Sequence, residues 1–184
     1  MTKPEDHDPR DPQLRETGAA LRAVWRAAEE EWTRAAFEAW EHERTLVDVA
    51  RDCMHRGDTV TVQLPGRRLI GPVVSVGDDF VRIGTATGPV DVRVSCDARF
   101  HLRVVAPARA GGSRGLPGVA TFRARLLQFE ADRAAVEIGV HGTSDVMVGS
   151  ITVGRDQVSL EDGNDGRVYV PIGSLSWVRP VDVD

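Results

Sequence analysis

Several residue types are scarce in this 184-residue chain, and each scarcity excludes a class of protein. Lys3 is the only lysine, and the net charge is −5 although 23 residues are Lys or Arg. Binding nucleic acid through charge alone requires a clustered positive face. No segment of the chain is basic enough to provide such a face, so an electrostatic nucleic-acid binder is not expected.

Cysteines and long apolar runs are also scarce. Cys53 and Cys96 are the only cysteines, in no metal-binding spacing, and we expect reduced thiols in a cytoplasmic protein. The polar N-terminus lacks the apolar core of a signal peptide. No apolar run approaches the ~20 residues of a membrane span, so no membrane contact is expected.

Turn-forming residues, by contrast, are plentiful. The chain has 18 Gly and 10 Pro but only 5 Phe and 1 Tyr, which favours an aliphatic, β-rich core with many tight turns. Residues 1–12 are charged and proline-rich without apolar periodicity, and they predict a disordered tail.

Residues 13–44 predict an N-terminal amphipathic helix. Its apolar stripe has 4-3-4-3-4 spacing and consists of Leu21, Trp25, Ala28, Trp32, Ala35 and Ala39. Val24, Phe37 and Trp40 are expected to widen this stripe. The candidate partner-binding residues are Trp25, Trp32 and Trp40. Because an exposed tryptophan stripe promotes aggregation, the alternative is that the helix packs on the rest of the chain or on a second copy.

The rest of the chain predicts two copies of one arrangement, a short helix followed by five strands. Thr45 is expected to cap a short helix that ends at Gly57-Asp58. Period-two patterns then predict five strands, at residues 59–64, 69–76, 79–84, 90–94 and 100–105. Residues 107–118 read as a linker, and 121–133 as a helix. The second set of strands is expected at residues 134–140, 145–153, 156–160, 167–170 and 175–178.

One phrase occurs in both halves, as VSVGDDFVRIG at residues 74–84 and ITVGRDQVSLEDG at residues 151–163. The two stretches align at an offset of 77 residues, and the preceding strands align at 78, which predicts a duplication. In each copy the Gly is expected to supply a positive φ, and the Asp to bond backbone amides within the turn.

The stretch VTVQLPGRRLIGPVVSVGDDFVRIG (60–84) resembles the first motif of Sm-like (Lsm, Hfq-type) proteins through Gly66, Leu69, Gly71, Asp79 and Val81. GRVYVPIGSLSWV (166–178) resembles the end of the same SH3-like small barrel. The layout also resembles actinobacterial proteins with an N-terminal helix and tandem barrels, some labelled Fis family transcriptional regulators. The resemblance implies a mainly β fold with helices, with Sm-like barrels at residues 45–106 and 119–180.

The chain departs from the Sm pattern where that family contacts RNA. The Asn that ends the first motif is replaced by Arg82-Ile83 and Ser159-Leu160. The later Arg-Gly or Lys-His element is replaced by Val94-Ser95-Cys96 and Val170-Pro171-Ile172. No helix-turn-helix pattern with a basic recognition helix is present either.

No catalytic, cofactor or metal site is predicted, and an enzyme is not expected. The five histidines show no metal-ligand spacing. Asp78-Asp79 and DGNDG (162–166) read as turns, and GGSRG (111–115) reads as linker because it lacks the GK[ST] of a phosphate loop. Ser95-Cys96 is the nearest candidate nucleophile, but a buried thiol is the simpler interpretation.

Two functions remain open. The first is a non-catalytic binding or scaffolding module, which binds protein or self-associates through the N-terminal helix and the barrel edges. The second is an RNA- or DNA-binding regulator, which rests on the fold resemblance. Its candidate contacts are Arg67, Arg68, Arg123 and Arg125, for which a solvated basic edge is the alternative.

Overall fold

The computed structural model describes residues 12–94, 101–108, 111–112, 118–162 and 166–181 of the chain. It divides the chain into two compact units, Met1–Arg44 and Thr45–Asp184. Each unit is described by itself. In the described ranges, no helix is both long enough and apolar enough to pass through a membrane.

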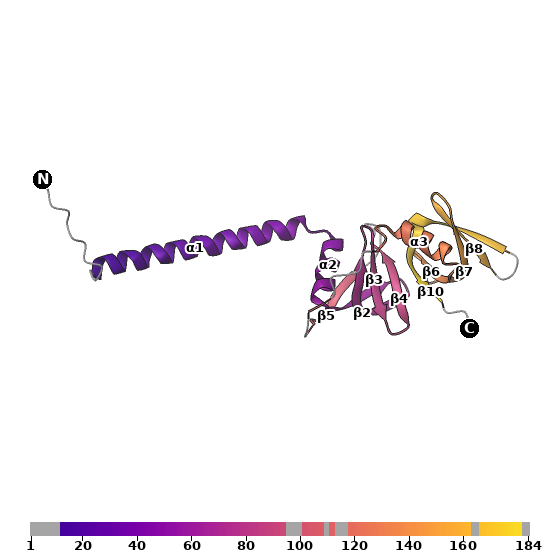
Figure 1. Ribbon diagram of the computed structural model, residues 1–184, viewed down its shortest axis with the longest axis horizontal. Coiled ribbons are helices and arrows are strands. Elements are labelled where there is room, and N and C mark those ends of the chain that lie inside the picture. The colour runs from indigo at the N-terminus through magenta and orange to yellow at the C-terminus, as the bar shows by residue number, and fades with distance from the viewer. Residues whose placement is uncertain (1–11, 95–100, 109–110, 113–117, 163–165, 182–184) are drawn as a thin grey trace. The chain divides into compact units, whose positions relative to one another are not determined.

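The first unit contains one helix, α1, which spans Pro12–Glu43 (Figure 1). The predicted helix is confirmed, but it begins at Pro12, which we had placed in the tail. A proline is tolerated in the first turn because its missing N–H would have no partner there. The remainder of the predicted tail lies outside the described residues.

Helix α2 (Leu46–Arg56) opens the second unit and has both predicted ends. Thr45 and Asp48 form a capping box, in which the Thr45 hydroxyl accepts from the Asp48 amide and the Asp48 carboxylate accepts from the Thr45 amide. Gly57 ends the helix in the left-handed conformation, with φ 76°. Ala50, Cys53 and Met54 are buried and anchor the helix to the strands that follow.

Ten strands and a third helix follow α2. Their bounds are β1 Thr59–Leu64, β2 Arg67–Val76, β3 Phe80–Thr85, β4 Gly88–Arg93, β5 His101–Ala106, α3 Phe122–Ala131, β6 Ala135–Val140, β7 Val146–Val153, β8 Gln157–Asp162, β9 Gly166–Pro171 and β10 Leu175–Pro180. Each predicted helix and strand is confirmed to within about two residues at its ends. A short 3₁₀ turn at Ile172–Ser174, which we did not predict, separates β9 from β10.

The strands form one antiparallel run in the order β5-β1-β2-β3-β4-β10-β6-β7-β8-β9. Strands β1–β5 form the first half of this run, and strands β6–β10 form the second. In each half the first four strands pair in sequence order, and the fifth strand (β5 or β10) pairs with the first (β1 or β6). This agrees with the duplication that the sequence predicts. What the sequence does not predict is the junction, where Trp177 and Val178 of β10 pair with Val92 and Asp91 of β4. The two halves are thereby joined into one ten-stranded sheet that ends at β5 and β9.

The doubled phrase forms the same turn in both halves. The Gly77 amide donates to the Phe80 carbonyl at 2.9 Å, and the Gly154 amide donates to the Gln157 carbonyl at 2.8 Å. The Asp79 carbonyl accepts a 2.8 Å hydrogen bond from the Val94 amide directly after β4, and the Asp156 carbonyl accepts one of 2.8 Å from the Ile172 amide directly after β9. The repeat in the sequence is therefore a repeat in backbone geometry.

Our explanation of this phrase was wrong in two respects. Gly77 and Gly154 do not have positive φ. Gly77 is instead required by close approach, because a Cβ there would lie 2.3 Å from the Phe80 ring and 2.6 Å from the Ala120 carbonyl. Asp79 bonds no amide of its own turn, but accepts from the Phe122 amide at 2.6 Å and so holds the start of α3.

Two clusters of buried side chains form the core of the second unit, and each includes an aromatic residue from the other half. The first lies between α2 and strands β1–β4 and includes Trp177 of β10. The second lies between α3 and strands β6–β10 and includes Phe80 of β3, whose ring centroid lies 6.3 Å from that of Phe122. The two halves therefore interlock.

The described part of the predicted linker is attached to the end of α2. The Ala108 amide donates to the Asp58 carboxylate at 3.1 Å, and the Gly112 amide donates to the His55 carbonyl at 3.0 Å. Residues 109–110 and 113–117 of the linker lie outside the described residues, as does Ser95-Cys96.

Candidate functional site

The largest exposed aromatic side chains lie on α1. Trp25 and Trp32 keep 74% and 79% of their surface exposed, and Leu21 keeps 55%. The three alanines of the same stripe are also exposed. At 100° per residue, all six stripe positions fall within an arc of about 80°. Within its own unit, α1 thus carries the predicted stripe as one continuous exposed face.

Trp40, the third candidate partner-binding residue, is separate from this stripe. It lies about 80° from Trp32 around the helix axis, and Phe37 lies about 140° from Trp32, so Phe37 does not widen the stripe. The Trp40 ring contacts Phe37 at a centroid distance of 5.6 Å, and the Arg44 guanidinium stacks over it at 4.0 Å. Trp40 therefore belongs to a small local cluster, whereas Trp25 and Trp32 share an open surface.

The two end strands of the sheet form a second candidate surface. No described strand pairs with the outer edge of β5 or of β9. Both strands carry exposed apolar side chains: Val104 and Val105 on β5, and Val168 and Tyr169 on β9. An unpaired edge presents backbone donors and acceptors to another strand, so both edges can take part in pairing between chains.

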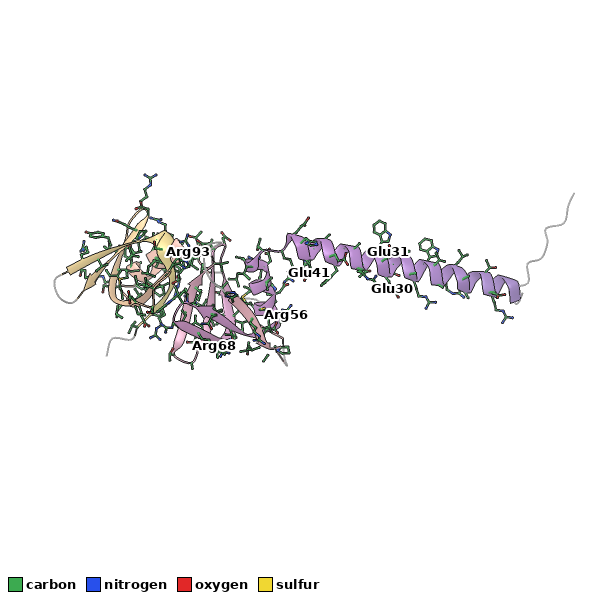
Figure 2. All side chains as sticks on the ribbon, turned by 180° about the vertical axis from the view of Figure 1, so that it is seen from behind. Glu30, Glu31, Glu41, Arg56, Arg68 and Arg93 are labelled. Carbon is green, nitrogen blue, oxygen red and sulfur yellow. The ribbon has the colours of Figure 1, made fainter. Side chains whose placement is uncertain are left out.

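The four candidate nucleic-acid residues lie in different environments. The Arg67 guanidinium stacks over Trp177 at 4.1 Å and lies 3.4 Å from Glu137. Its neighbour Arg68 is exposed on β2 (Figure 2). Arg123 donates to the Gly154 carbonyl at 3.0 Å.

Arg125, the fourth candidate, is engaged within the protein. Its guanidinium donates to Asp91 at 3.0 Å, stacks over the Phe129 ring at 4.2 Å and bonds Gln128. Of the four arginines, only Arg68 has an exposed side chain that makes no hydrogen bond or ion pair with the residues that the structure describes. The arrangement does not build one continuous basic surface from these four residues.

A cleft of about 270 Å³ lies beside Arg67. It is bordered by the β1–β2 turn at Pro65–Gly66, the β6–β7 turn at Thr143–Asp145 and the Trp177 side chain. Arg67 is stacked on Trp177 and shares the Glu137 carboxylate with Arg179, so its guanidinium is held by contacts within the protein. We find no group in this cleft that is arranged for acid–base or nucleophilic chemistry.

Asp91 is the most deeply buried charged group, and our sequence analysis missed its role. Its side chain is fully buried, and its two oxygens accept from Arg82 at 2.8 and 2.9 Å and from Arg125 at 3.0 Å. The available signal was a carboxylate between two core valines, Val90 and Val92, which requires a cationic partner. Arg82 therefore pairs within the protein.

Two other polar groups at the end of α2 have shifted pKa values. Burial opposes the charge on Asp58, but hydrogen bonds from Arg56 and from the Ala108 amide outweigh burial and lower the pKa of this carboxyl. Burial raises the pKa of the Cys53 thiol, which is free and inaccessible. A raised pKa and full burial make Cys53 a packing residue rather than a nucleophile.

Metal-ligand chemistry gains no support from the geometry. Within the part of the chain that the structure describes, no group of three or more His, Cys, Asp or Glu could hold a metal ion.

The chain was also compared with known proteins. No protein-family model, no curated protein and no solved structure matches it. The assignment of function therefore depends on the surfaces of the chain itself.

Proposed function

We propose that this chain is a non-catalytic, cytoplasmic interaction module that self-associates through α1 and through the edges of its sheet. The observation that carries the proposal is the exposure of Trp25 and Trp32 on one face of α1, at 74% and 79%. Such a face is stable in water only when a partner covers it for much of the time, because large exposed apolar surfaces aggregate. Tryptophan is also the residue most enriched at binding hot spots.

For the sheet, we propose two Sm-like small barrels at residues 45–106 and 119–180. The support is the repeated strand order, β5-β1-β2-β3-β4 and β10-β6-β7-β8-β9, with a short helix before each copy. The junction between the halves also suggests how the edges are used. At this junction β4 of the first half pairs with β10 of the second half. In the repeat, β4 corresponds to β9, and β10 corresponds to β5. The same pairing between two chains would join β9 of one to β5 of the next, head to tail.

Nucleic-acid binding is the second candidate, favoured by the exposure of Arg68 on β2. The pairing of Arg125 with Asp91, and of Arg67 with Glu137, weakens it because those guanidinium groups are already held by partners within the protein. If the chain binds nucleic acid, the nuclease-untreated protein should show an excess of absorbance at 260 nm, and Arg67→Glu/Arg68→Glu should remove that excess. Protein that purifies free of nucleic acid would contradict this second candidate.

Sedimentation of the full chain over a range of concentrations tests self-association through α1. We expect the wild-type chain to form dimers or larger species. Trp25→Ala/Trp32→Ala should weaken association at least about 1000-fold, since each hot-spot tryptophan contributes about 2 kcal/mol and both partners lose two of them. Trp40→Ala is the matched control and should leave association unchanged. A wild-type chain that stays monomeric at its highest soluble concentration would refute self-association.

A further inference from the structure

The apolar stripe of α1 has an order of large and small side chains that restricts how a second helix can cover it. The positions read Leu21, Trp25, Ala28, Trp32, Ala35 and Ala39. Their spacing alternates between four and three residues, which gives the seven-residue repeat of the seam in a two-stranded coiled coil. In such a coil, one stripe residue of each helix meets in every layer of the seam. Which residues meet depends on the direction of the partner helix.

A parallel, in-register pair of these helices would pack poorly. Each residue would meet its own copy, so Trp25 and Trp32 would each face an identical tryptophan, while Ala28 and Ala35 would each face an alanine. Layers of two tryptophans are overfilled, and the alanine layers between them leave voids. Both deviations from normal packing density are unfavourable.

An antiparallel pair has one register in which every layer combines a large and a small residue. In this register, the sequence numbers of any two stripe residues that face each other add up to 60. Trp32 then faces Ala28 of the second copy, Trp25 faces Ala35, and Leu21 faces Ala39. The two-fold axis passes at Glu30, and all six stripe residues take part, because symmetry repeats each of these three layers. A shift by one heptad would place Trp32 against Leu21 in one direction, and Ala28 against Ala39 in the other.

The charge along α1 independently favours the same direction. Residues 12–27 contain three arginines and one glutamate, whereas residues 28–43 contain six glutamates and one arginine. Three of these acidic side chains, Glu30, Glu31 and Glu41, are labelled on the C-terminal half of α1 in Figure 2. In a parallel pair the acidic halves would lie together and repel each other. In an antiparallel pair each acidic half lies beside the basic half of the other helix.

We propose that α1 pairs with α1 of a second copy of this chain as an antiparallel coiled coil in this register. This inference rests on the proposed self-association and specifies the partner and its direction. Glu30, at the level of the axis, lies on the side of the helix opposite the stripe. Glu29 and Glu31 flank the stripe and approach their own copies at the rim of the seam, where water screens them. The pairing of large with small side chains and the pairing of acidic with basic halves of the helix therefore favour the same antiparallel arrangement.

Disulfide trapping in the full chain tests direction and register, with Cys96→Ser as background and Cys53 left buried. In the proposed register, Ala39→Cys and Leu21→Cys face each other between chains. A mixture of the two single variants should form a cross-linked heterodimer, and each variant alone should form none. In an antiparallel pair the two copies of residue 39 are about 27 Å apart along the helix axis, far beyond disulfide reach.

Each other outcome has a defined meaning. Cross-linking of Ala39→Cys with itself would overturn the proposal in favour of a parallel pair. Failure of the mixture to cross-link, while the chain still sediments as a dimer, would overturn this face or register but leave self-association standing. A monomeric chain would refute the proposed function as well.

A size exchange provides a second test that does not depend on thiols. Ala28→Trp alone places two tryptophans in one layer and should weaken association at least about tenfold, given the usual penalty for overfilled cores. Adding Trp32→Ala restores one large and one small residue to that layer and should recover most of the loss. Absence of recovery would contradict the pairing of residues 28 and 32.

Discussion

Asp91 shows how one residue can depend on contacts from distant parts of the chain. It is fully buried on β4, and it accepts hydrogen bonds both from Arg82 on the neighbouring strand β3 and from Arg125 on α3. A buried carboxylate is tolerated only when its charge is compensated and its oxygens are hydrogen-bonded. Asp91 thus fixes the position of α3 relative to the first half of the sheet.

We predict that Asp91→Asn lowers the free energy of unfolding by about 3 kcal/mol, because two largely buried guanidinium groups lose their counter-charge. Urea unfolding followed by circular dichroism measures the effect. Asp78→Asn, in the exposed turn nearby, is the control and should change stability by less than about 0.5 kcal/mol. Equal effects of the two substitutions would show that the Asp91 ion pairs add nothing to stability.

Among the secondary-structure elements, β2 and β7 share a glycine that the duplication preserved for a steric reason. A Cβ on Gly71 would lie 1.8 Å from the Gly84 carbonyl, and a Cβ on Gly149 would lie 2.6 Å from the Glu161 carbonyl. Both glycines therefore let a bent strand approach its neighbour closely. Strand β2 shows a register shift near Gly71, between Val73 and Ser75.

We predict that Gly71→Ala destabilises the chain by about 3 kcal/mol, because the added methyl group meets backbone that cannot move aside. Gly149→Ala should act in the same direction with a smaller effect, since the clash there is less severe. The control is Gly111→Ala, where the new methyl group meets no atom within 4 Å. Thermal unfolding of the three variants would contradict this reading if Gly71→Ala and Gly111→Ala had the same midpoint.

For the whole molecule, the important property is that the two halves of the sheet are not independent. The first core includes Trp177 from β10, the second includes Phe80 from β3, and Asp79 holds the start of α3. The repeat is therefore a unit of sequence and of strand pairing, whereas the two halves together form one compact unit, Thr45–Asp184.

We predict that residues 45–184 alone unfold in one cooperative transition, and that residues 45–112 alone do not fold stably. The shorter fragment loses Trp177 from its core and Arg125 from Asp91, and it exposes Phe80 to water. Calorimetry together with circular dichroism distinguishes the two fragments. A cooperative transition of the shorter fragment near the temperature of the longer one would show that each half folds by itself.

The sequence alone determined the local features of this protein. Periodicity located α1 and the ten strands, Thr45 and Gly57 located the ends of α2, and the doubled phrase revealed the duplication. These features depend on side chains a few residues apart, whose spacing can be read directly. The apolar stripe of α1 was found for the same reason.

Only the tertiary structure decided how the two halves join. The pairing of β4 with β10, the exchange of Trp177 and Phe80 between cores, and the pairing of Arg125 with Asp91 link residues that are far apart in the chain. An alternating strand pattern shows which face of a strand is buried but not which strand lies beside it. The local pattern therefore defined the elements, and long-range packing determined which candidate residues remained exposed for a partner.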